Sequence, residues 1–147
     1  MDMTPKAYQE YVKAKAPKSP IVRDCLRAFL VGGLICALGQ AIQNGWLAAG
    51  LTKDDAGAAT ACCLVLLSAV LTGLNLYNNI GRFGGAGSLV PITGFANSVV
   101  SPAIDFKAEG FITGMAAKMF QIAGPVIVFG SLASVIYGVI LMLLQSF

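Results

Sequence analysis

The charged residues of this 147-residue chain leave four long stretches without a single charge. These stretches are residues 28–52, 56–81, 83–104 and 119–147. Each is long enough for the roughly 20 apolar residues with which a helix crosses a bilayer. Only 12% of the residues are charged and 56% are hydrophobic, whereas a soluble domain is about one quarter charged. The spacing therefore predicts an all-α integral membrane protein with three to four transmembrane helices.

The net charge lies ahead of the first apolar stretch. Six of the ten basic residues and three acids lie in residues 1–27, so this segment carries the whole net charge of +3. A basic segment directly before a first crossing keeps the N-terminus on the cytoplasmic side. A cleaved signal peptide fits less well, because the apolar run begins late, is too long and is followed by further membrane segments.

The charge pattern divides the chain into a basic amphipathic arm, residues 1–19, and a single transmembrane helical domain, residues 20–147. Thr4 followed by Pro5 is typical of a helix start. Tyr8 and Tyr11 then fall on one face of that helix, opposite charged side chains. We expect an interfacial helix whose partner is membrane lipid, with a partly frayed, solvated arm as the alternative.

The first two crossings have recognisable ends. The first should run from about residue 20 to 43, where the pair Asn44 and Gly45 would end it. Thr52 with Asp55 three residues later is a capping box, which predicts the start of the second crossing. We expect that helix to last to about Tyr77.

The third stretch differs from the others because it is rich in glycine and polar residues and contains two prolines. Its glycines at 84, 85 and 87 would free the backbone, and Pro91 and Pro102 remove hydrogen-bond donors. Within a membrane such interruptions survive only where protein or water satisfies the exposed backbone groups. We therefore predict a broken or re-entrant element lining a cavity, with helix N-termini near both prolines.

The last part begins as a segment from residue 109 to 121, and Gly124 with Pro125 should start the final crossing, which runs to about Leu144. Small residues at four-residue spacing let helices approach closely in lipid. We expect such packing faces, used within an assembly, on the first and last crossings. They consist of Gly33, Gly130, Ser134 and Gly138.

Several polar groups of the third and fourth stretches could face a shared lumen and line a path for a small polar solute. An alternative for the charged residues there is that all four, Asp105, Lys107, Glu109 and Lys118, lie at the headgroup layer and snorkel. The pore-lining candidates are Pro91, Thr93, Asn97, Ser98, Lys107, Lys118 and Gln121.

Catalytic chemistry has little support in this composition. The chain has no histidine and only seven acids, so no catalytic, cofactor or metal site is predicted, and we expect no nucleic-acid partner. The glycine-rich run at 81–87 lacks the GK[ST] ending of a phosphate loop. The four cysteines, at positions 25, 36, 62 and 63, are interpreted as small packing residues, with a redox or lipidation role for the adjacent pair as the alternative.

Two segments, GGAGSLVPITGFANSVVSPAIDFKAEG at 84–110 and KMFQIAGPVIVFG at 118–130, closely resemble the stage V sporulation protein AC family. The likeness covers nearly the whole chain. It implies a membrane channel subunit of the SpoVA complex of endospore-forming Firmicutes, which moves dipicolinic acid with calcium into the forespore and releases it during germination. It also implies tension gating, the spore inner membrane as location, and other SpoVA membrane subunits and a soluble dipicolinate-binding subunit as partners.

The resemblance assigns no function to individual residues, and it leaves two alternatives open. The chain could be a non-conducting membrane scaffold that anchors the soluble subunit through its basic arm. It could also be an energy-coupled transporter, for which Asp105 and Glu109 are the candidate carboxylates. Because one small chain cannot enclose a solute path, we expect a homo- or hetero-oligomer. The side of the C-terminus stays open.

Overall fold

The computed structural model of this chain describes residues 4–16 and 20–145, and every element in these ranges is helical. The elements are α1 (Pro5–Lys15), α2 (Ile21–Ala48), α3 (Lys53–Gly73), α4 (Tyr77–Gly84), α5 (Ala86–Leu89), α6 (Ile92–Asp105), the 3₁₀ turn η1 (Lys107–Glu109), the π-helical turn η2 (Phe111–Ala116) and α7 (Ala117–Gln145).

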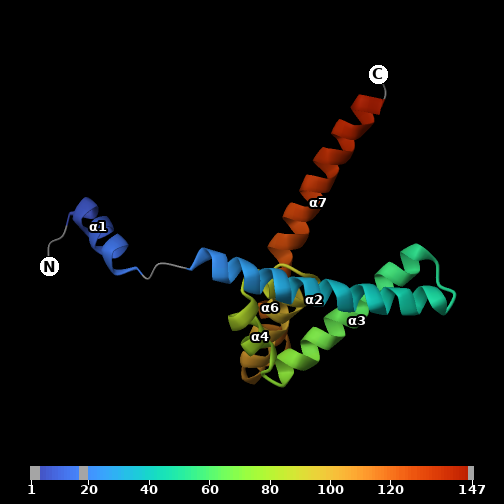
Figure 1. Cartoon of the computed structure of the whole chain (residues 1–147), viewed down its shortest axis with the longest axis horizontal. Helices are drawn as coiled ribbons and strands as arrows, with labels where there is room; N and C mark the ends of the chain where they lie inside the picture. Colours follow the sequence, from blue (N-terminus) through green and yellow to red (C-terminus); the bar gives the residue numbers. More distant parts are fainter. Residues whose placement is uncertain (1–3, 17–19, 146–147) are drawn as a thin grey trace.

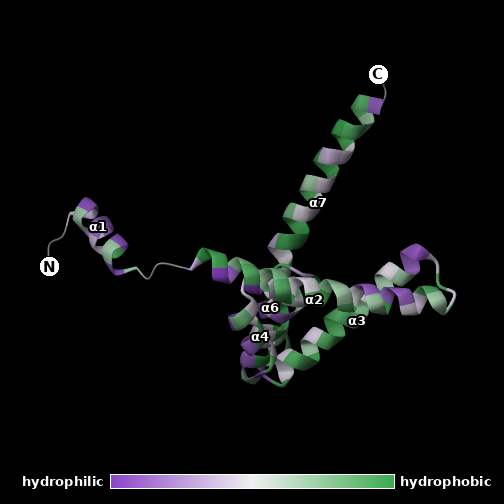
Figure 2. Cartoon of the chain, viewed as in Figure 1, coloured by the Kyte–Doolittle hydropathy of each residue, from purple (hydrophilic) through white to green (hydrophobic). Residues whose placement is uncertain are grey.

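Three helical segments in the described ranges are long and apolar enough to span a membrane: Ile21–Ala48, Lys53–Gly73 and Phe111–Gln145. Figure 2 shows hydrophobic residues along these segments, while hydrophilic residues gather at α1, at the turn between α2 and α3 and around α4. The predicted all-α membrane protein is therefore confirmed.

The arm forms the helix α1, which starts as predicted. The Thr4 side chain accepts a hydrogen bond from the Ala7 backbone amide at 3.4 Å, and every described residue of the arm is exposed. Figure 1 shows α1 set apart from the other helices. The proposed boundary at residue 19 lies outside the described residues, and the division into arm and domain stays a prediction.

The first spanning helix, α2, is longer than expected. The predicted end at Asn44 and Gly45 is wrong, because the helix continues to Ala48. Gly50, with φ of 94°, then adopts the left-handed conformation, and the Leu51 amide donates to the Trp46 carbonyl at 3.2 Å. This is a Schellman motif, in which a left-handed residue just beyond the helix satisfies its last carbonyl groups.

The second spanning helix, α3, starts as predicted but ends early. The Thr52 side chain accepts a hydrogen bond from the Asp55 amide at 3.3 Å and donates to the Asp55 carboxylate at 2.7 Å. The predicted end at Tyr77 is wrong, since the helix stops at Gly73. Asn75, with φ of 57°, closes it with a second Schellman motif, and Tyr77 starts α4 instead.

The glycine- and proline-rich stretch is broken, as predicted, into α4, α5 and α6. Gly85, with φ of 51°, separates α4 from α5, and Pro91 is the N-cap of α6. The helix start expected near Pro102 is wrong, because this proline lies inside α6. A proline removes one amide donor from the ladder, and the Phe106 amide still donates to the Pro102 carbonyl at 3.0 Å, so the helix continues.

The last spanning segment is continuous. The predicted start at Gly124 and Pro125 is wrong, because Pro125 lies inside α7 and the segment begins at Phe111 as η2. Gly110, with φ of 104°, sets the turn before it, and the Met115 amide donates to the Gly110 carbonyl at 3.1 Å in the π-helical pattern. Figure 1 shows α7 projecting away from the other helices.

The packed core lies where α3 and α6 meet, with α2 against α3 and α5. Glycine brings these backbones together. A Cβ atom on Gly87 would lie 2.0 Å from the Ala28 carbonyl oxygen of α2, and one on Gly84 would lie 2.7 Å from Val31. The glycines of the glycine- and proline-rich stretch therefore mainly allow helices to approach closely. Within this stretch a positive φ is needed only at Gly85.

The small residues expected to pack in an assembly meet no partner helix within residues 4–16 and 20–145. An added Cβ on Gly33, Gly130 or Gly138 would meet no atom within 4 Å, and Ser134 is exposed, its hydroxyl donating to the Gly130 carbonyl. Their role between subunits stays a prediction.

Candidate functional site

A cluster of hydroxyl groups lies buried among α3, α4, α5 and α6. The Ser68 hydroxyl of α3 donates to the Thr93 carbonyl of α6. The Tyr77 hydroxyl donates to the Ser88 carbonyl at 2.7 Å and shares a hydrogen bond with the Thr93 hydroxyl at 2.9 Å. Ser68 and Ser88 have no exposed surface, and Tyr77 is 2% exposed.

These hydrogen bonds explain how the broken element survives beside apolar helices. A polar group buried without a partner costs about 1–3 kcal/mol. Among the described residues, no buried side-chain nitrogen or oxygen lacks a hydrogen-bond partner. The Ser88 carbonyl and the Thr93 carbonyl lie next to the helix breaks, and side chains from α3 and α4 satisfy both. The cluster thus fixes α5 and the start of α6 against α3.

One helical turn further along, a polar cavity of about 180 Å³ opens between the end of α3, the start of α4 and α6. Two of the residues that line it are joined, since the Thr72 hydroxyl is hydrogen-bonded to the Asn97 side chain at 2.9 Å. Three amides and two hydroxyls offer both donors and acceptors without a formal charge. The residues that line the cavity are Thr72, Asn75, Asn78, Asn97 and Ser101.

Two of the seven predicted pore-lining residues belong to this site. Thr93 is 5% exposed and held in the buried cluster, while Asn97 lines the cavity. Pro91 lies next to the cluster as the N-cap of α6. Ser98 is half-buried, and its hydroxyl donates within α6 to the Phe95 carbonyl at 2.7 Å.

The other three candidates lie elsewhere. Lys107 is exposed in η1, and Gln121 is exposed on α7. The Lys118 ammonium group lies 4.0 Å from the centre of the Phe106 ring, a cation–π contact that stabilises a charge near apolar surroundings. None of these three residues is among those that line the polar cavity, and their role in a pore stays a prediction.

Sequence reasoning missed four residues that line the cavity: Thr72, Asn75, Asn78 and Ser101. Two of them lie one helical turn after another polar residue. Thr72 follows Ser68 of the buried cluster by four positions, and Ser101 follows Asn97 of the cavity by four positions. This spacing places both members of each pair on the same helix face. It was the available signal for a polar face on α3 and α6.

The described residues hold no cluster of three or more histidine, cysteine, aspartate or glutamate side chains that could bind a metal ion. The cysteines were predicted to be small packing residues. Within the described chain this prediction is largely wrong, because Cys25, Cys36 and Cys62 are exposed and only Cys63 is half-buried. In a membrane protein, exposed side chains of spanning helices meet lipid or another subunit.

Comparison with known proteins decides the family. The model of the SpoVAC/SpoVAEB sporulation membrane protein family matches residues 24–140. The chain belongs to this family. It is also 52% identical over 134 residues to the stage V sporulation protein AC of Bacillus subtilis (strain 168), covering 90% of this chain and 89% of that protein. No solved structure matches it significantly.

Membership in the SpoVAC/SpoVAEB family agrees with the resemblance carried by the two segments at 84–110 and 118–130. Both segments lie within the matched residues, and they contain α5, α6 and the first half of α7. The chain is therefore a sporulation membrane protein with a role as a component of the SpoVA system, and its family is not an enzyme family.

Proposed function

We propose that this chain is a channel subunit through which dipicolinic acid, accompanied by calcium, enters the forespore and leaves it during germination. The observation that carries the proposal is the polar cavity between α3 and α6. It lies at the end of the spanning helix α3, against the broken element, and in a membrane protein polar groups that line a cavity beside a spanning helix can mark a route for a solute or an ion.

The chemistry of the cavity suits this solute. Dipicolinate is a flat dianion, and its calcium chelate has a net charge near zero. A lining of amides and hydroxyls can hydrogen-bond carboxylate oxygens and coordinate calcium through amide oxygens, without the strong binding that a ring of charges would give. Conduction requires such moderate binding, because the solute must also leave the site.

The conduit is completed by other chains. A cavity of about 180 Å³ on one side of a helix pair is part of a wall rather than a closed path. Other SpoVA membrane subunits or further copies of this chain would supply the remaining wall, and the exposed small residues Gly33, Gly130, Ser134 and Gly138 would pack against them. Replacing Gly138 with leucine should then lower the assembled mass measured by size-exclusion chromatography with light scattering.

The location and gating belong to the same proposal. The protein lies in the spore inner membrane with its N-terminus in the cytoplasm, and membrane tension opens the path. The helix breaks at Gly85 and Pro91 support gating, because α5 and α6 can move as separate units once tension breaks the hydrogen bonds that hold them against α3 and α4.

The experiment that tests the proposal is efflux of dipicolinate with calcium from liposomes under stepped osmotic tension. We expect Asn97→Leu to reduce release, because it replaces a polar wall of the cavity with an apolar one. Asn44→Leu is the matched control, since Asn44 is exposed on α2 and does not line the cavity. Equal release by both variants and the unchanged protein would contradict the proposal.

The scaffold alternative is supported by the exposed, basic helix α1, which is free to bind a partner. In that case removal of residues 1–16 abolishes recruitment of the soluble dipicolinate-binding subunit, while Asn97→Leu has no effect on spore dipicolinate content. Dipicolinate release should be compared between liposomes that contain the intact chain alone and liposomes that contain it with other SpoVA membrane subunits. This comparison distinguishes an incomplete conduit from a non-conducting scaffold.

A further inference from the structure

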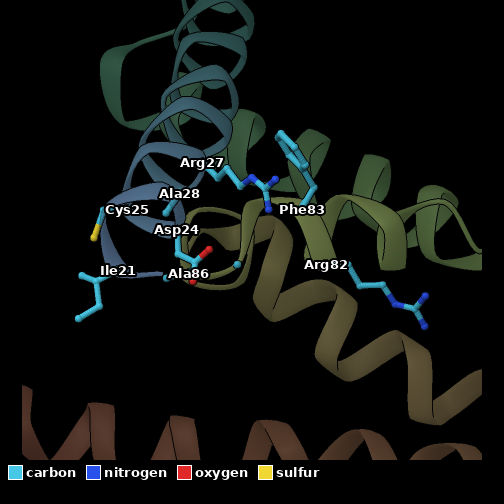
Figure 3. Close-up of a pocket in the computed structure, with 9 residues that line it drawn as sticks. Ile21, Asp24, Cys25, Arg27, Ala28, Arg82, Phe83 and Ala86 are labelled. Atoms are coloured by element: carbon cyan, nitrogen blue, oxygen red, sulfur yellow. The ribbon is translucent and has the colours of Figure 1, made fainter. Parts of the chain in front are cut away.

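A second cavity, of about 440 Å³, lies between the first turns of α2 and the junction of α4 and α5. It is separate from the polar cavity and shares no lining residue with it. Figure 3 shows the α2 residues on one side and Phe83 of α4 on the other, with Ala86 close to the start of α2. Most of its wall is apolar, formed by Ile21, Ala28, Phe83 and Ala86 among others.

Charged groups meet this apolar wall from two helices. Arg27 reaches from α2 toward α4, and its guanidinium carbon lies 4.9 Å from the centre of the Phe83 ring (Figure 3). Arg82 extends from the rim in another direction, and the Asp24 carboxylate is the only acid in the lining. Two arginines against one aspartate leave the cavity wall net positive.

The place of the cavity in the membrane narrows the choice of ligand. Ile21 is the first residue of the spanning helix α2, so the cavity lies near the surface of the membrane. Ile21 is also 73% exposed. The α2 surface beside it is apolar, since Val22 and Leu26 are 76% and 59% exposed. A ligand there would meet a cation at one end and an apolar surface along its side.

We propose that this cavity binds the headgroup of an anionic phospholipid, with the phosphate at Arg27 and an acyl chain along Ile21 and the exposed face of α2. Arg82 strengthens the attraction from the rim. Basic pockets between membrane helices at the membrane surface bind lipid headgroups, and this cavity lies beside the start of a spanning helix. A soluble dianion would find few polar groups here besides the two arginines, so the mixed wall favours lipid.

The Phe83 ring makes Arg27 more than a general surface charge. Contact with the ring restricts the guanidinium group to the cavity, and a group held in place before binding loses less freedom when a ligand arrives. Asp24, one turn earlier on the same helix, opposes an anion. The site therefore contains one attractive and one repulsive group whose removal should have opposite effects.

The test is a titration of the detergent-purified full-length chain with phosphatidylglycerol and with phosphatidylcholine, read by native mass spectrometry. We expect Arg27→Gln to lower the preference for phosphatidylglycerol over phosphatidylcholine by about tenfold. This is the effect on affinity of losing one hydrogen bond to a charged group. Asp24→Asn should raise this preference. Arg23→Gln is the matched control, because it removes the same charge from the same part of α2 outside the cavity lining.

Any of three results would overturn the proposal. If Arg27→Gln and Arg23→Gln lowered the preference equally, attraction by the general surface charge would account for lipid binding. If inorganic phosphate or dipicolinate displaced the lipid at constant ionic strength, the cavity would be a site for soluble anions.

Circular dichroism checks that the variants keep their helices. If Arg27→Gln fails to fold, the absence of a gain in lipid preference in Asp24→Asn alone refutes the site. Lipid retention requires no transport, so its failure is distinguishable from failure of the channel proposal.

Discussion

The close approach of α5 to α2 predicts that Gly87→Ala will destabilise the protein strongly. The new Cβ atom would lie 2.0 Å from the Ala28 carbonyl oxygen and 2.7 Å from the Ala28 Cα, whereas ordinary contact begins at 3.4 Å. Both atoms belong to the backbone, so a side-chain rotation cannot relieve the clash. The short helix α5 has to move away from α2.

The size of this effect follows from the cost of overpacking. An extra methyl group in a well-packed site costs about 1–3 kcal/mol, and a clash with backbone lies at the upper end. A loss of about 3 kcal/mol shifts the folding equilibrium by about a hundredfold. For a chain of this length it lowers Tm by about 6–12 °C, at 2–4 °C for each kcal/mol.

The assay is thermal unfolding in detergent, followed by circular dichroism. Gly33→Ala is the matched control, because an added Cβ there meets nothing within 4 Å and alanine favours a helix by about 1 kcal/mol over glycine. Its Tm should stay equal or rise. If Gly87→Ala and Gly33→Ala unfolded at the same temperature, the inferred packing of α5 on α2 would be wrong.

Three further changes test other parts of the fold by the same Tm measurement. Tyr77→Phe should cost about 1–3 kcal/mol because it leaves the Thr93 hydroxyl and a buried carbonyl without their partner, and a Tm equal to that of the unchanged protein would contradict the buried cluster. Thr52→Ala should cost about 1 kcal/mol through loss of the cap on α3, with an unchanged Tm as the contrary result. Gly50→Ala should cost about 1–2 kcal/mol because its φ of 94° is unfavourable for alanine, and a higher Tm would argue against the left-handed turn.

Features that depend on local chemistry could be predicted from the sequence. The spanning helices follow from the charge-free stretches, and the cap at Thr52 follows from the pattern of side chains three residues apart. Helix ends were harder to place. Gly45 and Gly50 are both possible terminators of α2, and only the hydrogen bonds around the left-handed Gly50 distinguish them.

Features that depend on contact between distant segments could not be predicted. The polar cavity combines Thr72 with Asn97, 25 positions apart, and its existence depends on how α3 packs on α6. The same holds for Gly87, whose role is set by Ala28 on another helix. Pro125 shows that a local signal can also mislead, because proline is common in the first turn of a helix, yet this one lies inside α7.

The central claim is that the polar cavity belongs to an aqueous path for the solute, and thiol labelling at Asn97 tests it most directly. In a chain whose four cysteines are replaced by alanine, Asn97→Cys in proteoliposomes would be exposed to a charged, membrane-impermeant methanethiosulfonate. Val135→Cys, on the exposed surface of α7, is the control that faces lipid or protein. We predict that Asn97→Cys reacts faster than the control and that dipicolinate with calcium slows its reaction. A rate as low as that of Val135→Cys under every tension would contradict the account.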